Sequence, residues 1–223
     1  MNEEKALKVF KRIKAVQYDD HFVLASYDHS STYINKDLLY IHHRETKAMC
    51  TSIAENLACL SVEVVIGPAM GGVIPSSRVA EHLSDKYGHG RDIPSIFADK
   101  VKGGFEIRPD FIKIIKGEDN INGRRGRNVL VVDDVITTGQ SVKKVIEAVC
   151  KAGGNVVGVG ALWNRGGIRP KEFGNIRKLY SLVNWKLETW PKALCPLCAA
   201  DIPVNTELGR GKEYLSLIGS SGT

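Results

Sequence analysis

The sequence has no apolar run long enough to cross a membrane, because none reaches about eighteen residues. Residues 1–5 are charged, and residues 6–10 that follow have neither the long apolar core nor the small-residue cleavage site of a signal peptide. Cysteine is scarce as well, since the five cysteines form an odd count without the density of a disulfide framework. These absences predict a cytoplasmic protein with reduced cysteines and no membrane partner.

Long runs of one charge sign are absent too, and only Arg124-Arg125-Gly126-Arg127 forms a basic cluster. The chain carries 31 Lys and Arg residues against 25 Asp and Glu residues, a formal net charge of +6 that attracts polyanions. Because the basic residues are otherwise spread along the chain, nucleic acid is not expected as a partner. A small phosphate ester fits this charge pattern better.

The apolar pattern predicts an α/β fold with a parallel sheet. Short apolar runs at 62–66, 95–98, 129–132 and 156–163 alternate with helical patterns at 73–83 and 141–152. Two further helices are predicted at 3–16 and 43–59. Short strands joined by a turn are predicted at 21–40, and a last strand at 178–187. We expect a single domain at 1–208, with a core at about 46–165, a hood at about 1–45 plus C-terminal elements, and a flexible tail at 209–223.

The segment Val129–Ser141 carries the most chemical information. An apolar strand leads into Asp133 and Asp134, and the turn Thr137-Thr138-Gly139 then opens a helix. Ligands of parallel sheets bind beyond the carboxyl ends of the strands, where two carboxylates can accept hydrogen bonds from ribose hydroxyls. The backbone N–H groups of the turn suit a phosphate. The structural alternative is an acidic strand end followed by a threonine-capped helix.

Two commoner phosphate motifs do not fit this turn. It lacks the lysine of a nucleoside triphosphate P-loop, and its glycine spacing differs from that of a dinucleotide fingerprint. A second glycine-rich loop, Gly67-Pro68-Ala69-Met70-Gly71-Gly72, joins the strand pattern at 62–66 to a helix pattern. Such a loop is weak evidence for a binding site on its own, but the evidence is stronger here because the loop precedes the acidic motif in the same predicted sheet.

Val131–Ser141 resembles the 5-phosphoribosyl 1-pyrophosphate motif of type I phosphoribosyltransferases, and 67–72 resembles the pyrophosphate loop of that family. The resemblance implies a parallel-sheet type I phosphoribosyltransferase fold with a small N-terminal hood and a C-terminal extension. It also implies that these two segments bind substrate, through Gly67, Pro68, Ala69, Met70, Gly71, Gly72, Val135, Ile136, Thr137, Thr138, Gly139, Gln140 and Ser141, together with Arg165 in a later turn.

Three further segments are similar to orotate phosphoribosyltransferases. Residues 22–26 and 33–37 resemble the hood that closes over the base, and Phe97-Ala98-Asp99-Lys100 matches the start of the mobile catalytic loop. A tail with Trp190-Pro191 and Cys195-Pro196-Leu197-Cys198 resembles a branch with a shorter loop. The resemblance implies an enzyme of pyrimidine (UMP) biosynthesis that transfers the phosphoribosyl group to orotate, giving orotidine 5′-monophosphate, and that forms a homodimer.

The same resemblance implies roles for individual residues. Asp133 and Asp134 would hold the ribose hydroxyls and stabilise positive charge on the sugar, while Mg²⁺ would be bound mainly by substrate oxygens, with these two carboxylates as possible further ligands. Lys100 is the first candidate for the contact with departing pyrophosphate, followed by Lys102 and Arg108. Lys36 of the hood is the candidate cation for orotate.

The chain departs from the orotate pattern in two places. Its catalytic loop is shorter and less basic, and Ser26-Tyr27-Asp28 stands where the family has Ser-Gly-Arg. The base therefore stays open, with a purine or modified pyrimidine as alternatives. A regulator that binds the donor without catalysis is the alternative from a different class. His29 could assist Lys36 as a counter-charge, or be an ordinary surface histidine.

The cysteines suggest little chemistry from sequence alone. Cys195 and Cys198 form a Cys-x-x-Cys pair, but structural zinc takes four ligands and the chain offers no second pair at suitable spacing. A metal site would need histidines from elsewhere in the chain or from a partner subunit. Redox chemistry is less favoured, because the pair does not open a helix after a strand. Cys50, Cys59 and Cys150 are predicted to lie in the core on apolar helix faces.

Overall fold

The computed structural model describes residues 1–117, 126–174 and 176–219. The chain forms two compact units. The first consists of Met1–Leu7 and His43–Trp185, and the second of Lys8–His42 and Lys186–Thr223. Of the basic cluster at 124–127, Arg124 and Arg125 lie outside the described residues.

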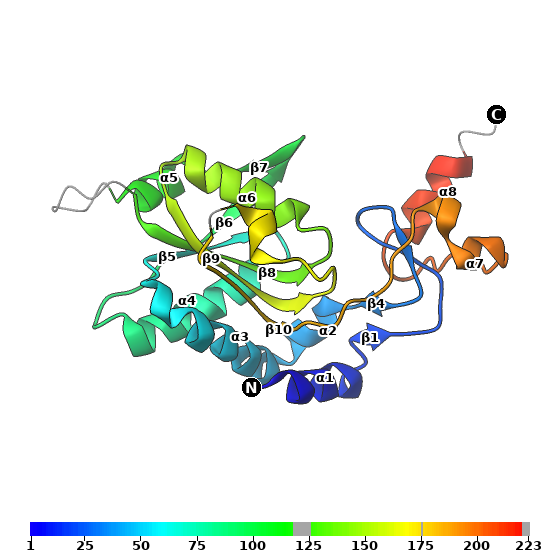
Figure 1. Cartoon of the computed structure of the whole chain (residues 1–223), viewed down its shortest axis with the longest axis horizontal. Coiled ribbons are helices and arrows are strands. Elements are labelled where there is room, and N and C mark those ends of the chain that lie inside the picture. Colours follow the sequence, from blue (N-terminus) through cyan, green and yellow to red (C-terminus); the bar gives the residue numbers. More distant parts are fainter. Residues whose placement is uncertain (118–125, 175, 220–223) are drawn as a thin grey trace. The chain divides into compact units, whose positions relative to one another are not determined.

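A six-stranded sheet forms the centre of the first unit, in the order β10-β9-β8-β5-β6-β7 (Figure 1). All neighbouring strands run parallel except β6 and β7, which form an antiparallel hairpin. The strands are β5 (Val64–Pro68), β6 (Ser95–Val101), β7 (Gly104–Glu106), β8 (Asn128–Ile136), β9 (Asn155–Asn164) and β10 (Lys178–Val183). Every residue of β5 is buried, as expected for a central strand covered on both faces. The α/β prediction with a parallel sheet is thereby confirmed.

Helices cover both faces of this sheet (Figure 1). On one face lie α3 (His43–Leu57) and α4 (Val73–Tyr87), and on the other α5 (Pro109–Lys116) and α6 (Gln140–Lys151). Helix α6 buries Val142, Val145 and Val149, which recur at helical spacing and pack with the sheet. The short helices η1 (Ala58–Leu60) and η2 (Pro170–Phe173) complete the unit.

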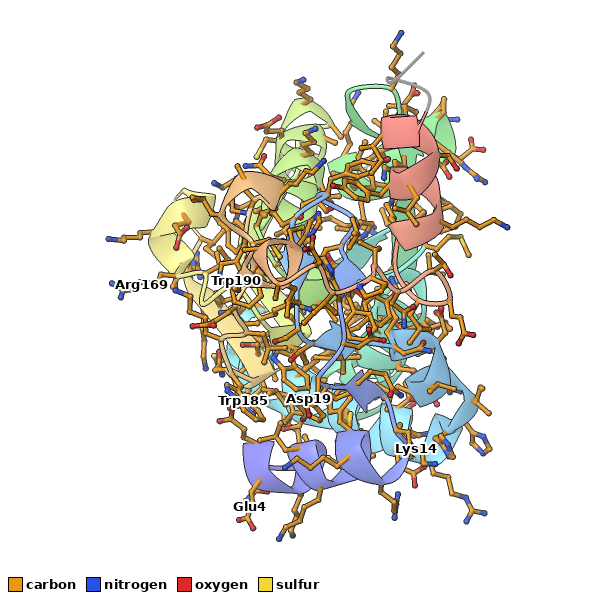
Figure 2. The ribbon with its side chains drawn as sticks, turned by 90° about the vertical axis from the view of Figure 1, so that its right-hand side faces the viewer. Glu4, Lys14, Asp19, Arg169, Trp185 and Trp190 are labelled. Atoms are coloured by element: carbon orange, nitrogen blue, oxygen red, sulfur yellow. The ribbon has the colours of Figure 1, made fainter. Side chains whose placement is uncertain are left out.

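The first unit extends to Trp185, past the expected core boundary at about residue 165, because β10 pairs in parallel with β9. Trp163, which is fully buried, donates a hydrogen bond from Nε1 to the carbonyl of Trp185 at 2.9 Å. The two rings stack at 20° with centroids 6.4 Å apart, and Trp185 is labelled in Figure 2. This contact holds the end of the unit against β9.

The second unit interlaces residues from both ends of the chain. Its elements are β1 (Val16–Gln17), β2 (Phe22–Val23), β3 (His29–Ser30), β4 (Tyr33–Ile34), α2 (Lys36–Ile41), η3 (Lys192–Leu194), α7 (Pro196–Ala199) and α8 (Gly211–Gly219). Helix α1 (Glu3–Arg12) crosses from the first unit into the second. The backbones of His29 and Trp190 exchange hydrogen bonds of 2.7 and 2.8 Å, and Asn205 N–H donates to the His21 carbonyl at 2.8 Å.

Several predictions of local structure are corrected. Cys59 and Cys150 are exposed, because each lies at the solvent side of its helix end, whereas Cys50 is buried as predicted. Within the expected flexible tail at 209–223, Gly211–Gly219 forms α8 with Tyr214 buried, and residues 220–223 lie outside the described residues, so the flexibility of the tail stays a prediction. Among the described residues, no helix is long and apolar enough to cross a membrane.

Candidate active site

Three connections leave the sheet at the carboxyl ends of adjacent parallel strands. They are the β5–α4 loop at 69–72, the β6–β7 hairpin, and the β8–α6 turn at 137–139. Strand β5 lies between β6 and β8, so the three connections begin at neighbouring positions along one edge. Ligands of open parallel sheets bind at this edge.

The β5–α4 loop is tightly closed. A Cβ atom added to Gly67 would stand only 2.3 Å from the carbonyl oxygen of Gly72, and Gly72 N–H donates to the Pro68 carbonyl at 2.8 Å. Ala69 N–H donates to the Ala98 carbonyl of β6 at 2.9 Å, while the side chain of Met70 is 81% exposed. The peptide bond between Ala69 and Met70 is cis. Glycine at both ends lets the backbone turn back on itself directly above the strand.

This loop packs directly against the strand that carries the paired acids. A Cβ atom on Gly72 would lie 2.6 Å from the carbonyl oxygen of Val132, the residue before Asp133. The structure therefore brings residues 67–72 together with Asp133 and Asp134, as a shared sheet edge predicts. Both segments belong to the first unit, so the juxtaposition is internal to one compact body.

Asp133 and Asp134 lie within β8 rather than beyond its end, because β8 continues to pair with β9 as far as Ile136. The side chains are 6% and 4% exposed. Asp133 Oδ1 accepts a hydrogen bond from the Asp134 N–H at 2.9 Å, and Asp134 Oδ1 accepts one from the Val135 N–H. These bonds orient both carboxylates, so each keeps a defined direction in the buried strand end.

The turn after β8 leaves the first turn of α6 open for an anion. Gly139, the N-cap residue, occupies the left-handed region with φ 73° and has no side chain to cap the helix, and among the described residues Thr138 Oγ1 accepts a long hydrogen bond of 3.4 Å from the Gln140 N–H. Thr138, Gln140 and Ser141 are exposed, and Thr137 is partly buried. The N–H groups of a helix's first turn have no partner within the helix, and the helix dipole favours negative charge there. The arrangement suits a phosphate group.

The turn after β9 supports the β8–α6 turn from the side, a contact that was not predicted from the sequence. Gly166 N–H donates to the Ile136 carbonyl at 3.0 Å, and a Cβ atom on Gly166 would stand 1.7 Å from the Thr137 carbonyl oxygen. Arg165, the preceding residue, is only 2% exposed. A glycine two residues after a buried strand was the available signal for this close approach.

The three basic candidates near the β6–β7 hairpin differ in their surroundings. Lys100 lies in β6 opposite Phe105 of β7, and Lys102 lies in the connecting turn. Both are exposed, and in the part of the chain that the structure describes no hydrogen bond or ion pair engages either ammonium group. The predicted mobile loop is thus a hairpin in this structure, with Lys100 on an ordered strand.

Arg108, by contrast, is held in place. Its Nε and Nη2 donate to the two carboxylate oxygens of Asp99 at 2.7 and 3.2 Å, and its guanidinium carbon lies 4.8 Å from the ring centroid of Phe97. The hydrogen bond from Arg108 lowers the pKa of Asp99 below its ordinary value. Arg108, the N-cap residue of α5, is therefore fastened to β6, which leaves the two lysines as the more available cations.

Lys36 lies in a different unit from the other candidate residues. It is the first residue of α2 and belongs to the second unit, whereas the other candidate residues belong to the first. Its side chain is partly buried. Its role toward the base stays a prediction.

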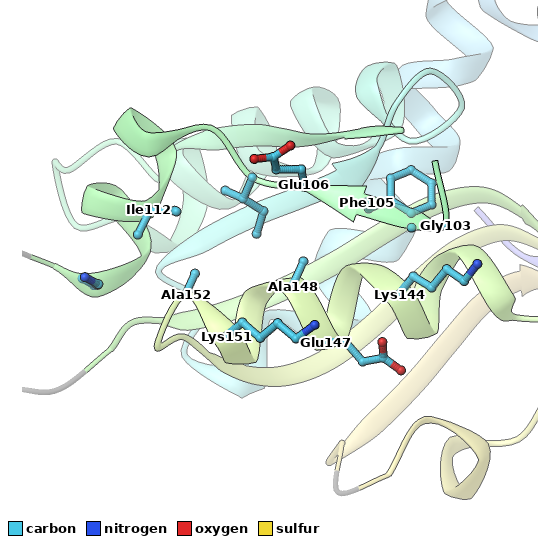
Figure 3. A pocket seen from close by; sticks show the side chains of 12 residues that line it. Gly103, Phe105, Glu106, Ile112, Lys144, Glu147, Ala148, Lys151 and Ala152 are labelled. Carbon is cyan, nitrogen blue, oxygen red and sulfur yellow. The ribbon is translucent and has the colours of Figure 1, made fainter. Parts of the chain in front are cut away.

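A separate hollow of about 450 Å³ lies between β7, α5 and α6 (Figure 3). Phe105 and Glu106 of the hairpin, Ile112 of α5, and Lys144 and Lys151 of α6 line it. Neither paired acid nor any residue of the loop at 67–72 or the turn at 137–139 borders this hollow. It offers no carboxylate pair beside a helix N-terminus, so the strand edge is the better candidate for the active site.

Comparisons with known proteins agree with this geometry. Residues 38–194 match the model of the phosphoribosyl transferase domain. The orotate phosphoribosyltransferase of Caldanaerobacter subterraneus subsp. tengcongensis is 34% identical over 204 residues, which cover 92% of this chain and 96% of that protein. The one from Bartonella henselae is 31% identical over 206 residues, covering 91% and 95%.

A solved structure is also similar. The orotate phosphoribosyltransferase of Aeropyrum pernix superposes with a TM-score of 0.55 at 26% identity, over 80% of this chain and 93% of that one. The expected type I phosphoribosyltransferase fold is thereby confirmed. With most of the chain matched by the family model and by relatives above 30% identity, this protein belongs to the phosphoribosyltransferase family, among the orotate phosphoribosyltransferases.

Proposed function

We propose that this protein transfers the 5-phosphoribosyl group from 5-phosphoribosyl 1-pyrophosphate to orotate, giving orotidine 5′-monophosphate and pyrophosphate. The single observation that carries the proposal is the packing of Gly72 against Val132, because it puts a glycine-rich loop beside two buried carboxylates and an open helix N-terminus. A diphosphate, a ribose and a 5′-phosphate need these three environments side by side. The relatives named orotate phosphoribosyltransferase support orotate as the acceptor.

In the proposed reaction, a ring nitrogen of orotate forms a bond to the anomeric carbon as the bond to pyrophosphate breaks. Positive charge develops on the sugar and negative charge on the leaving group. Asp133 and Asp134 would hold the ribose hydroxyls and stabilise the positive charge, and their orienting backbone bonds mean that little reorganisation is needed during the reaction. The loop at 69–72, in which the N–H groups of Ala69 and Gly72 are already hydrogen-bonded within the protein, would lie against pyrophosphate, and the first turn of α6 would bind the 5′-phosphate.

Lys100 is the proposed contact for the departing pyrophosphate. It is exposed and belongs to β6, which the Ala69–Ala98 hydrogen bond ties to the glycine-rich loop. An ammonium group near the leaving oxygens would stabilise the charge that develops there. Lys102 is the second candidate, whereas Arg108 is proposed to position the hairpin through Asp99.

We also propose that Mg²⁺ accompanies the substrate. Oxygen ligands suit this ion, which takes one or two protein carboxylates together with substrate phosphates. Asp133 and Asp134 fit, because they offer oriented carboxylates at the strand end where the diphosphate would lie. Bound there, the ion would neutralise charge on the diphosphate.

A homodimer and a cytoplasmic location stay predictions. The family supports the homodimer, and the free cysteines of the chain support the location. Light scattering of the purified protein tests the dimer.

An assay with several bases tests the proposed function. The protein is mixed with Mg²⁺, the donor and either orotate, uracil, adenine, guanine or hypoxanthine, and pyrophosphate release is followed. We expect release with orotate alone. Release with a purine instead would reassign the acceptor, and binding of the donor without release by any base would favour a regulator over an enzyme.

Charge-removing variants test the site within that assay. The double variant Asp133→Asn, Asp134→Asn keeps the shape of both side chains, and we expect its kcat/KM to fall by at least about 10³-fold, as for loss of a buried electrostatic contact to the transition state. Asp110→Asn, at an exposed carboxylate in α5, serves as the matched control. Full activity in a folded double variant would refute the assignment.

A further inference from the structure

Four metal-binding side chains from both ends of the chain meet inside the second unit. His21 precedes β2, His29 begins β3, Cys195 precedes α7, and Cys198 lies in α7. One ligand atom from each falls within 4.8 Å of all the others. The two histidines and Cys195 are buried, and Cys198 is partly buried. His29, for which a surface position was one expectation, is fully buried.

We propose that His21, His29, Cys195 and Cys198 bind one structural zinc ion that joins the two chain segments of the second unit. The Cys-x-x-Cys pair provides two of the four ligands, and His21 and His29 at the β2–β3 hairpin provide the other two. This inference concerns a site separate from the sheet edge of the first unit, and it does not depend on the proposed transferase reaction.

The spacing of the ligand atoms agrees with a tetrahedron. With Zn–S near 2.3 Å and Zn–N near 2.0–2.1 Å, adjacent sulfur and nitrogen ligands stand about 3.6 Å apart. His21 Nε2 lies 3.6 Å from Cys195 Sγ and 3.7 Å from Cys198 Sγ, and His29 Nδ1 lies 3.4 Å from Cys198 Sγ. The two histidine nitrogens are 2.7 Å apart, so the rings need to separate by roughly 0.6 Å for an ideal tetrahedron.

The hydrogen bonds around His21 favour metal binding. Its Nδ1 lies 2.7 Å from the carbonyl oxygen of Ile202, which can only accept, so Nδ1 carries the proton. Nε2 therefore presents a lone pair to the cluster. A ring nitrogen that donates to a backbone carbonyl while the other faces the ion is the usual outer-shell arrangement of metal-bound histidine.

A cluster without metal would leave His29 poorly satisfied. If His29 Nδ1 donated its proton to His21 Nε2, the buried Nε2 of His29 would be a bare acceptor, and it has no hydrogen-bond partner among the described residues. If Nε2 carried the proton, two lone pairs would face each other across 2.7 Å. A cation between the rings removes this conflict. The His29 ring packs perpendicular to the Tyr214 ring, with centroids 5.1 Å apart.

The ligand types select zinc among common metals. Two imidazoles and two thiolates in a closed four-ligand site match structural zinc, whereas Mg²⁺ and Ca²⁺ prefer oxygen ligands. Two thiolates also neutralise the ion, so the buried site carries no net charge. The two segments of this unit together fall below roughly 80 residues, a size at which small folds commonly rely on a metal or disulfides for stability.

Metal content is the first test. The untagged protein, expressed with zinc in the medium, is analysed by elemental mass spectrometry, and we expect about one zinc per chain. Cys198→Ser and His29→Gln should retain at most about a tenth of that. Cys59→Ser and His43→Gln, which change an exposed cysteine and an exposed histidine, are the matched controls and should keep the full amount.

Measurements on the unaltered chain cover the case in which a variant does not fold. Cobalt added to the chelator-treated protein should produce the absorption of a tetrahedral ion with thiolate ligands. Chelation should lower the melting temperature by at least about 10 °C, and zinc but not magnesium should restore it. A wild-type chain that binds less than about a tenth of an equivalent of zinc after reconstitution, a Cys195–Cys198 disulfide, or full zinc in Cys198→Ser would each overturn the proposal.

Phosphoribosyl transfer and zinc binding are measured in different assays, so either proposal can be refuted without affecting the other. Loss of zinc binding in the second unit leaves the assignment of Asp133 and Asp134 untouched, and an inactive transferase that binds one zinc leaves the metal site in place.

Discussion

Arg108 donates hydrogen bonds to both carboxylate oxygens of Asp99, and its guanidinium lies over the ring of Phe97. The pair connects the N-cap residue of α5 to β6, so it fixes the path of the chain on both sides of the hairpin that carries Lys100. The titration of Asp99 reports directly on this connection.

We expect the pKa of Asp99 to lie below its ordinary value and to rise in Arg108→Gln, because the charged hydrogen bond from Arg108 is the main cause of the shift. The folded-state pKa is lowered, so the small stabilisation exists above the unfolded pKa of about 3.9 and is lost as pH falls through the folded value. A carbon-detected NMR titration of the carboxyl group measures both values. Identical pKa values in the two proteins would contradict the ion pair.

Lys100→Ala should lower kcat/KM by at least about 100-fold, the scale of one lost electrostatic contact to the transition state. Lys102→Ala should lower it by less than about 10-fold, since Lys102 lies in the turn beyond the paired strands. Steady-state kinetics with both substrates measure these effects. Lys86→Ala, an exposed lysine in the last turn of α4, is the control. If Lys102→Ala had the larger effect, the assignment of Lys100 would be wrong.

Gly72→Ala should abolish binding of the donor and destabilise the protein by about 1–3 kcal/mol, because the new Cβ would lie 2.6 Å from Val132 O and force the loop off β8. Calorimetric titration with the donor and thermal unfolding measure the two effects. Gly219→Ala adds the same methyl group in open space and should change neither. Unaltered donor affinity in Gly72→Ala would show that the close approach is not needed for binding.

Cysteine reactivity should separate Cys50 from Cys59 and Cys150 according to their environments. Burial raises the pKa of Cys50 to about 12, so at pH 8 it is a protonated, enclosed thiol and should resist iodoacetamide in the folded protein. Cys59 and Cys150 are exposed and should react readily. Peptide mass spectrometry before and after unfolding gives the extent of modification at each site. Rapid modification of Cys50 in the folded chain would contradict the packing around α3.

The sequence alone predicted the parts of this protein that depend on local pattern. Alternating apolar strands and amphipathic helices indicated the parallel sheet, since burial on both faces requires continuous apolar runs such as 129–132 and 156–163. The acids at 133 and 134 and the two glycine-rich turns were identified because their residue types are unusual after buried strands. Their meeting at one edge followed from parallel topology, in which neighbouring strands end on the same side.

Tertiary structure decided what depends on residues distant in the chain. Asp133 and Asp134 lie inside β8 because pairing with β9 extends the strand, and Cys150 faces solvent because α6 uses its other side for the sheet. The meeting of His21 and His29 with Cys195 and Cys198 is the clearest case. No local pattern links residues more than 160 positions apart, because only the packing of both chain ends into one unit places their side chains around a common point.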